Sequence, residues 1–292
     1  MLKRNLVKFV FLVNSYLKRS GIGRSALVRY LRKGVHRLLM RIVAPDDVYL
    51  TRSNDIQMYV YTNTVSFHDY VLQSYEPYTT ELFKQAVKPR AVVVDIGAQF
   101  GYFSLIAAKL AGSQGRVYSF EPSASNFKLL KDNIRLNNID NITPFQKAVG
   151  ESSSVVTLFI YQGSDSHGMY PRPDTPVKER VEIECVALDQ FLPHETTDIV
   201  KIDIEGHEPY ALAGMKHLIS RNKHLILFTE LVPGFLRQAG VECQTYLDQI
   251  EALGFQIRLI DEDRRRLVPV ERSLVEKQDA FWHANLYCVK DN

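Results

Sequence analysis

Short apolar runs alternate with amphipathic stretches from Ala91 to the end of the chain, and this alternation limits the folds that the sequence can adopt. The runs that predict strands are AVVVDIG, GRVYSFEP, NITPFQKAVG, SVVTLFIY, TDIVKIDIEGHE, HLILFTEL, QIRLID and ANLYCVK. The stretches that predict helices are YFSLIAAKLAG, SASNFKLLKDNIRLNN, EPYALAGMKHLISRNK and CQTYLDQIEALGF. Strands that alternate with helices of about 10–15 residues are typical of an α/β fold with a doubly wound, mostly parallel sheet. We expect this domain to cover residues 90–292.

A smaller region, residues 45–89, precedes the predicted sheet. Its first part, VYLTRSNDIQMYVYTN, alternates and is rich in Tyr and Val, so it predicts one or two strands. The following HDYVLQSYEPYTTELFKQAV predicts a helix, with Thr79 and Thr80 as candidate N-terminal caps. We therefore expect a small strand and helix appendage ahead of the main domain.

The first 44 residues form a strongly basic arm. They contain 11 of the 36 Lys and Arg residues and no Asp or Glu, which leaves 25 basic against 33 acidic residues in the remainder. The stretch SALVRYLRKGVHRLLMRIV places apolar residues at helical spacing with basic residues between them, so residues 1–44 predict a basic amphipathic helical arm. Such a helix can lie on an anionic membrane surface, or pack on its own domain or on a second copy in a homo-oligomer. Nucleic acid is not expected as a partner, because no aromatic-rich set of strands accompanies the basic residues.

Targeting signals and cysteines indicate the compartment. The apolar run LVKFVFLV is shorter than the roughly 18 residues that cross a bilayer, and no small-residue cleavage site follows it. The three cysteines, Cys185, Cys243 and Cys288, are odd in number and far apart, which argues against a disulfide framework or a zinc site. We expect a cytoplasmic protein, with peripheral contact to the inner face of the membrane if the arm binds lipid.

The ends of the predicted strands carry the residues that indicate a ligand, because doubly wound sheets bind ligands at the carboxyl ends of their strands. The candidates for ligand binding at or just beyond these ends are Asp95, Gly97, Gln99, Gly101, Glu121, Ser123, Ala148 and Asp203. Glu121 follows Gly101 by 20 residues and is well placed to accept hydrogen bonds from both hydroxyls of a ribose, which also fits nicotinamide dinucleotides. Gln99, however, stands where a pyrophosphate needs a glycine, and the Asp95 carboxylate would repel phosphate. These residues instead predict S-adenosylmethionine (SAM), which has a ribose and an ammonium group but no phosphate.

Between Tyr75 and Lys290 the sequence contains, in this order, the motifs YEPYTTELF, VVVDIGAQFGYFSLIAA, VYSFEPSASNFKLLKDNIRLNN, KAVGESSS, VALDQFL and VKIDIEGHE. In the order and spacing of these motifs the sequence resembles the FkbM-type methyltransferases. The resemblance implies a class I, Rossmann-like, SAM-dependent fold and, usually, methylation of a hydroxyl oxygen on a sugar, glycan or natural product.

The resemblance also implies roles for individual residues. Asp95, Gly97 and Gly101 match the SAM-binding loop, Glu121 matches the ribose-binding acid, and Gln99 stands where the family more often has Asn. Two further positions are matched by place. Ala148 falls where the adenine-binding loop is expected, and the segment SDSHGMY falls where the family has a loop that faces the acceptor.

Methyl transfer from a sulfonium to a hydroxyl requires alignment of the reacting atoms and removal of the hydroxyl proton. The candidate bases are His207, His167 and Asp203. His207 follows the fourth strand and has an ordinary pKa of about 6.5, or it makes a structural hydrogen bond at a helix start. Asp203 could orient the acceptor, hold the SAM ammonium group, or cap the turn that follows it. The spacing of Asp203, Glu230 and His207 is not a recognisable set of metal ligands, so no metal is predicted.

Two other classes of function remain open. One is a nicotinamide-dependent oxidoreductase, which the failed glycine pattern and Asp95 disfavour. The other is a non-catalytic, membrane-associated scaffold that retains the fold; the intact candidate cofactor residues argue against it. The identity of the acceptor does not follow from the sequence.

Overall fold

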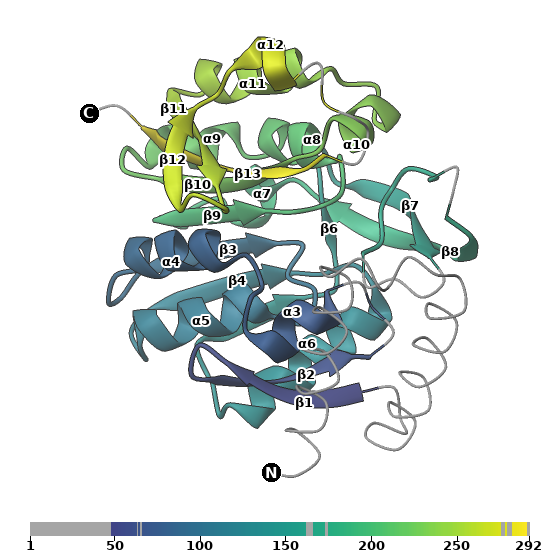
Figure 1. Ribbon diagram of the computed structural model, residues 1–292, viewed down its shortest axis with the longest axis vertical. Coiled ribbons are helices and arrows are strands. Elements are labelled where there is room, and N and C mark those ends of the chain that lie inside the picture. Colours follow the sequence, from purple (N-terminus) through teal and green to yellow (C-terminus); the bar gives the residue numbers. More distant parts are fainter. Residues whose placement is uncertain are drawn as a thin grey trace, which may run out of the picture. The chain divides into compact units, whose positions relative to one another are not determined.

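The computed structural model describes residues 48–62, 64, 66–161, 166–172, 175–275, 278 and 282–290 (Figure 1). The chain divides into two units, Met1–Tyr75 and Glu76–Asn292. The basic arm lies outside the described residues, so its amphipathic helix and its membrane contact stay predictions. Within the described ranges, no helix is both long and apolar enough to cross a membrane.

The first unit contains a β-hairpin and a short helix. Strands β1 (Val48–Ser53) and β2 (Ile56–Tyr61) pair in antiparallel register, which confirms two strands in this region. Asn54 and Asp55 form the two-residue turn with φ of 48° and 62°, a left-handed conformation that these residue types tolerate well. The helix α3 (Phe67–Leu72) follows.

The second unit is built on an eight-stranded sheet (Figure 1). Its strands are β3 (Val92–Ile96), β4 (Arg116–Phe120), β5 (Ile142–Phe145), β9 (Ile199–Ile202), β10 (Ile226–Leu231), β11 (Phe255–Asp261), β12 (Arg266–Pro269) and β13 (Ala284–Lys290). They lie in the order β12-β11-β13-β10-β9-β3-β4-β5. The strands from β10 to β5 are parallel, whereas β13 runs antiparallel between β10 and β11. This arrangement confirms the predicted doubly wound, mostly parallel sheet.

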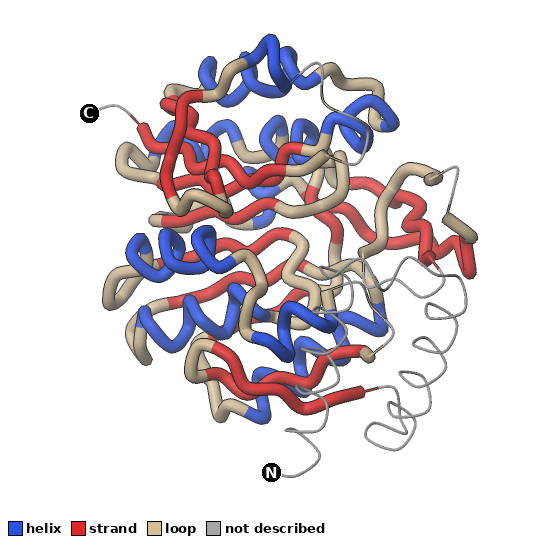
Figure 2. The backbone as a smooth tube through the Cα atoms, in the orientation of Figure 1, coloured by secondary structure: helices blue, strands red, loops and turns tan. Residues whose placement is uncertain are grey.

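Helices flank this sheet (Figure 2). They are α4 (Pro77–Ala86), α5 (Tyr102–Ala111), α6 (Ala124–Leu136), α7 (Leu188–Phe191), α8 (Glu208–Ala213), α9 (Lys216–Arg221), α10 (Pro233–Gln238), α11 (Cys243–Ala252) and α12 (Arg272–Val275). Because strand side chains alternate between faces, Val94 and Val200 join the apolar core with residues of α8 and α11. Asp95 and Lys201, one residue further along their strands, point to the opposite face, where they contact α5.

Two predicted helix features are wrong. The stretch EPYALAGMKHLISRNK forms two helices instead of one, and between them lies Gly214, which packs so closely on Gly150 that an added Cβ would lie 1.9 Å from the carbonyl oxygen of Gly150. Thr79 and Thr80 are buried inside α4 and do not cap it. The cap of α4 is instead Glu262, whose carboxylate accepts hydrogen bonds from the backbone N–H groups of Tyr78 (2.8 Å) and Thr79 (2.9 Å).

The second unit also contains a separate, three-stranded sheet. It consists of β6 (Ala148–Val149), β7 (Ser154–Tyr161) and β8 (Val177–Val186), in the order β6-β8-β7. Strand β8 was not predicted. Its sequence, VKERVEIECV, is largely charged and exposed along its first half, so it lacks the apolar run typical of a buried strand.

Candidate cofactor-binding site

The candidate residues gather where the order of the strands reverses. The chain passes from β3 to β4 and β5 on one side and then returns to β9 on the other side of β3. Asp95 lies in β3, Glu121 directly follows β4, and Asp203 directly follows β9. The carboxyl ends of these strands therefore form a topological switch point, the usual ligand site of such sheets.

The turn after β3 requires its glycines. Gly97 and Gly101 have φ of +84° and +91°, which residues with a side chain rarely adopt. A Cβ on Gly97 would lie 1.9 Å from the carbonyl oxygen of Asp203, and one on Gly101 would lie 2.5 Å from a methyl carbon of Leu130. The backbone N–H of Gly97 also donates to the carbonyl of Phe120 (2.9 Å). The turn is therefore packed closely against the ends of β4 and β9.

Glu121 joins two loops of the site. Its Oε2 accepts a hydrogen bond from the backbone N–H of Gln99, and its Oε1 accepts one from the N–H of Ser123, both at 2.9 Å. Burial raises the pKa of Glu121 to about 7, although these hydrogen bonds act in the opposite direction. The side chain of Asn126 provides a third hydrogen bond, and a carboxylate has about four lone pairs, so Glu121 can accept a further donor. The carboxylate is thus fixed in direction and able to receive a hydroxyl group.

Asp95 lies beneath the turn and is only 1% exposed. Its Oδ2 accepts a hydrogen bond from Ser104 (2.5 Å), whose hydroxyl also contacts that of Ser119 (2.7 Å). Its Oδ1 is buried and has no hydrogen-bond partner among the described residues. Burial raises the pKa of Asp95, and the charge of Lys201 opposes this shift.

Asp203 forms a partly buried ion pair with Lys201. The Lys201 Nζ lies 2.9 Å from Asp203 Oδ2 and 4.7 Å from the centre of the Phe103 ring. Burial alone would lower the pKa of Lys201, but the carboxylates of Asp203, Glu76 and Asp95 outweigh it and raise the pKa. Lys201 is therefore charged, and one Asp203 oxygen is bound to it.

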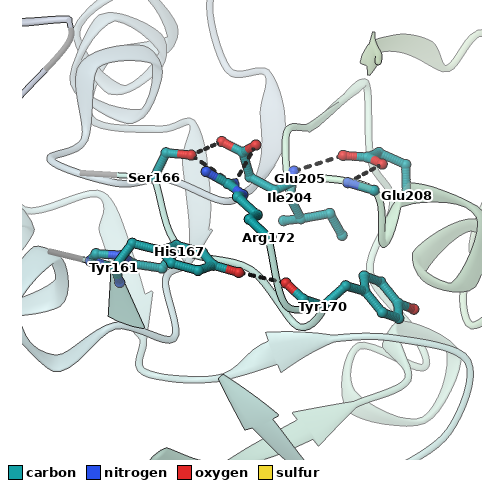
Figure 3. A network of polar contacts seen from close by, with 9 residues as sticks. Tyr161, Ser166, His167, Tyr170, Arg172, Ile204, Glu205 and Glu208 are labelled. Atoms are coloured by element: carbon teal, nitrogen blue, oxygen red, sulfur yellow. Dashed lines mark hydrogen bonds and ion pairs between the residues drawn. The ribbon is translucent and has the colours of Figure 1, made fainter. Parts of the chain in front are cut away.

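The turn after β9 is capped by Glu208. Its two carboxylate oxygens accept hydrogen bonds from the backbone N–H groups of Ile204 and Gly206, both at 2.9 Å (Figure 3). The capping role considered for Asp203 thus belongs to Glu208. Burial raises the pKa of Glu208 to about 8.

His207 directly precedes α8, and the side chains of Tyr170 and Tyr210 lie against its ring. Its Nδ1 lies 2.9 Å from the hydroxyl of Tyr170, and its ring stacks on Tyr210 at 4.8 Å between centroids. A Cβ on Gly150 would lie 3.0 Å from its Nε2. Burial lowers the pKa of His207 to about 4, so the ordinary value expected from the sequence does not hold and the ring is neutral at pH 7.

The loop after β7, which was predicted to face the acceptor, is attached to the turn after β9 (Figure 3). Arg172 donates from one nitrogen to Glu205 (2.8 Å) and to Ser166 (3.1 Å), and Ser166 also donates to Glu205. The guanidinium lies between the rings of Tyr161 and Phe235, at 4.7 and 4.5 Å from their centroids. Arg172 therefore fixes the loop through charge and stacking together.

His167 lies in the same loop. The backbone N–H of Tyr161 donates to its Nδ1 at 3.4 Å, and burial lowers its pKa to about 4. Its role as a base stays a prediction. Residues 164 and 165 of the predicted acceptor loop lie outside the described ranges.

Ala148 and Ser123 both make contacts within the protein itself. Ala148 packs in a small apolar cluster with Cys185. Lys147, its neighbour, pairs with Glu184 of β8. Ser123 donates its backbone N–H to Glu121 and so orients that carboxylate. The contacts of Ala148 and Ser123 with a cofactor stay predictions.

Sequence reasoning missed two residues of this site, Glu76 and Lys201. Glu76 belongs to the motif YEPYTTELF, in which an acid precedes a proline at a helix start, but nothing in the spacing places it beside β9. Burial raises its pKa to about 7. Within the described ranges, no group of three or more His, Cys, Asp or Glu residues could hold a metal ion.

The strand order and the acid-and-glycine turn define a class I methyltransferase fold, in which an antiparallel strand is inserted near one edge of a parallel sheet. Residues 95–257, more than half of the chain, match the FkbM methyltransferase domain. The chain therefore belongs to this family of SAM-dependent methyltransferases.

The chain is also similar to individual known proteins, at low identity or over a short segment. The FkbM methyltransferase of Methylobacillus flagellatus KT is 18% identical, over 76% of this chain and 53% of that one, with a TM-score of 0.43. A SAM-dependent O-methyltransferase of Thermotoga maritima is 14% identical, over 73% and 64%, with a TM-score of 0.41. The ribosomal protein L11 methyltransferase of Caldanaerobacter subterraneus subsp. tengcongensis is 33% identical over 66 residues, which are 23% of this chain and 21% of that protein. The chain thus spans about half of the first of these proteins and about a fifth of the last.

Proposed function

We propose that this protein transfers the methyl group of SAM to a hydroxyl oxygen of a sugar, glycan or natural product. The observation that carries the proposal is the Glu121 carboxylate, which two backbone N–H groups fix at the switch point. In this proposal Glu121 accepts a ribose hydroxyl, the turn from Gly97 to Gly101 lets the backbone approach the ligand, and Asp95 stabilises the amino-acid end. The hydroxyl acceptor rests on the family resemblance.

The charge of the site favours SAM over a dinucleotide. Asp95, Asp203 and Glu76 are acids around a single lysine, Lys201, in the described part of this cluster. A pyrophosphate would be repelled there, whereas SAM has a positive sulfonium and a positive ammonium group. The nicotinamide-dependent oxidoreductase is therefore disfavoured on electrostatic grounds as well as by Gln99.

In the proposed reaction, the acceptor oxygen forms a bond to the methyl carbon while the bond from that carbon to sulfur breaks. The sulfonium becomes the neutral thioether of S-adenosylhomocysteine, and the hydroxyl proton passes to a base. We retain His207 as the base, with His167 and Asp203 as alternatives. Because the pKa of His207 is about 4, it can accept a proton at any pH above that value, although it is a weak base.

Isothermal titration of the full-length protein with S-adenosylhomocysteine tests the cofactor site. We expect micromolar binding that is lost in Asp95→Ala and Glu121→Ala, and no binding of NADH. Wild-type affinity in either variant would remove that residue from the site. NADH binding in preference to S-adenosylhomocysteine would refute the proposed function.

The reaction itself is tested by transfer of labelled methyl from SAM to a panel of sugars, glycans and hydroxylated natural products. An O-methyl ether resists alkaline hydrolysis, whereas a methyl ester does not, so the linkage can be identified. We expect His207→Ala to lower turnover much more than SAM affinity. Full turnover of that variant would place the base elsewhere, and cofactor binding without transfer to any acceptor would favour the scaffold.

A further inference from the structure

Glu76 is held in an unfavourable backbone conformation. Its φ of 40° and ψ of 62° are left-handed, and it directly precedes Pro77, the first residue of α4. Left-handed backbone is strained for a residue with a Cβ, and a following proline disfavours helical conformations further. Its side chain makes no capping hydrogen bond to α4 among the described residues, because Glu262 supplies that cap. Helix formation therefore does not explain why a glutamate stands here.

The Glu76 carboxylate is incompletely satisfied. Asn285 of β13 provides a hydrogen bond to it, but Oε2 is buried and has no partner in the part of the chain that the structure describes. A buried acceptor without a donor is costly, and native proteins retain few of them. Strain and an unmatched acceptor in one residue are typical of a group that meets a ligand.

The surroundings of Glu76 are negative. Asp203, Glu262 and Glu230 all interact with it electrostatically, and Lys201, which has its close contact with Asp203, supplies the positive charge. Asp95 lies opposite Lys201 in the register of β3 and β9 and has the second unmatched buried oxygen of this cluster. Two acceptors without donors, among more acids than bases, call for a cation that also donates hydrogen bonds.

SAM has two cationic groups, but they differ in what they offer. The sulfonium has no hydrogen to donate, whereas the α-ammonium has three N–H donors. We propose that Glu76 Oε2 accepts a hydrogen bond from the α-ammonium group of SAM, beside Asp95. This inference rests on the proposed function and adds a residue to it from the segment before β3.

Ligand truncation tests the proposal. S-adenosylhomocysteine carries the α-ammonium group, whereas 5′-methylthioadenosine has the same adenosine and thioether without the amino-acid part. We expect Glu76→Gln to weaken S-adenosylhomocysteine binding at least tenfold, about 1.4 kcal/mol, and to leave 5′-methylthioadenosine binding unchanged. The matched control is Glu81→Gln, an exposed residue of the same helix that pairs with Arg265; it should change neither affinity.

The outcomes separate the two proposals. Unchanged S-adenosylhomocysteine affinity in Glu76→Gln, or an equal loss for both ligands, would overturn the role of Glu76 and leave the proposed function standing. Failure of the wild type to bind S-adenosylhomocysteine would refute the proposed function itself. Unchanged affinity with lost methyl transfer would assign Glu76 to the acceptor and would also overturn the ammonium contact.

Proton release gives a second readout that does not depend on a weak ligand. The groups that face Glu76 are Lys201, Asp203, Glu230, Glu262 and Asn285. Burial raises the pKa of the Glu76 carboxyl group to about 7, so an ammonium group that binds at pH 7 should expel part of a proton. Calorimetry with S-adenosylhomocysteine in buffers of different ionisation enthalpy should show less release for Glu76→Gln than for the wild type, and no difference at pH 9. Equal release at pH 7 would overturn the proposal.

Discussion

Replacement of Gly97 by alanine should both destabilise the protein and disable the cofactor site. At φ of +84° an alanine is strained by about 1–2 kcal/mol. Its Cβ would also lie 1.9 Å from the carbonyl oxygen and 2.9 Å from the carbonyl carbon of Asp203. Real Cβ contacts begin near 3.0 Å, so the two backbones must separate by about 1 Å. Overpacking of this kind costs about 1–3 kcal/mol, and the sum is about 2–5 kcal/mol.

The matched control is Gly254→Ala. Gly254 has a similar φ of +89°, but none of the described atoms lies within 4 Å of its added Cβ, so it should show the strain alone. Since each kcal/mol lowers Tm by about 2–4 °C in a domain of this size, the control should lose about 2–8 °C, and Gly97→Ala should lose more. Titration with S-adenosylhomocysteine should show wild-type affinity for Gly254→Ala and a loss of at least about tenfold, or 1.4 kcal/mol, for Gly97→Ala. Equal Tm losses in the two variants, or intact binding by Gly97→Ala, would refute the close packing of the turn on Asp203.

Two further expectations follow from the buried acids and from Arg172. Burial raises the pKa of Glu121 to about 7 and that of Glu208 to about 8, whereas these carboxyl groups have a pKa near 4.5 in the unfolded chain. Between pH 6.5 and 8 the folded state therefore holds protons that the unfolded chain has released, and the Tm of the free protein should fall as the pH rises. A constant or rising Tm would contradict this. Arg172→Lys keeps the charge but loses the planar stacking, so hydrogen exchange of the Phe159 amide, which donates to the Gly168 carbonyl, should accelerate while S-adenosylhomocysteine affinity stays constant. Unchanged exchange of this amide would show that Arg172 does not fix the loop. The matched control is Arg180→Lys, which loses a contact with the ring of Phe159 itself.

The parts of the structure that the sequence predicted are those with local causes. Buried parallel strands read as apolar runs, so the alternation from Ala91 onward was enough to predict the doubly wound sheet. Once the strands are placed, the carboxyl ends meet at one edge, which is why Asp95, Glu121 and Asp203 could be grouped without any knowledge of distances. The glycines of the turn were likewise recognisable, because their residue type reflects a backbone requirement.

The features that the sequence did not predict depend on partners far along the chain. Glu262 caps α4 from 184 residues away, so the nearby Thr79 and Thr80 were the wrong choice. The pKa of His207 is set by enclosure between Tyr170, Tyr210 and Gly150, which no spacing reveals. Burial and distant contacts, rather than residue type, determine these properties.

The site combines a rigid frame with unmatched acceptors, and this combination explains how it could select its ligand. Glu121 bonds the loops after β3 and β4 together, while Gly97 packs directly on Asp203 after β9. Because these three loops are already fixed to one another, binding does not have to order them, and little affinity is lost to that step. Asp95 and Glu76, in contrast, each keep a buried oxygen that no described residue satisfies. A ligand that brings N–H donors and positive charge to those oxygens gains both contacts, whereas a neutral or anionic ligand of the same shape gains neither. The fixed loops therefore select the shape of the ligand, and the unmatched acceptors select its charge.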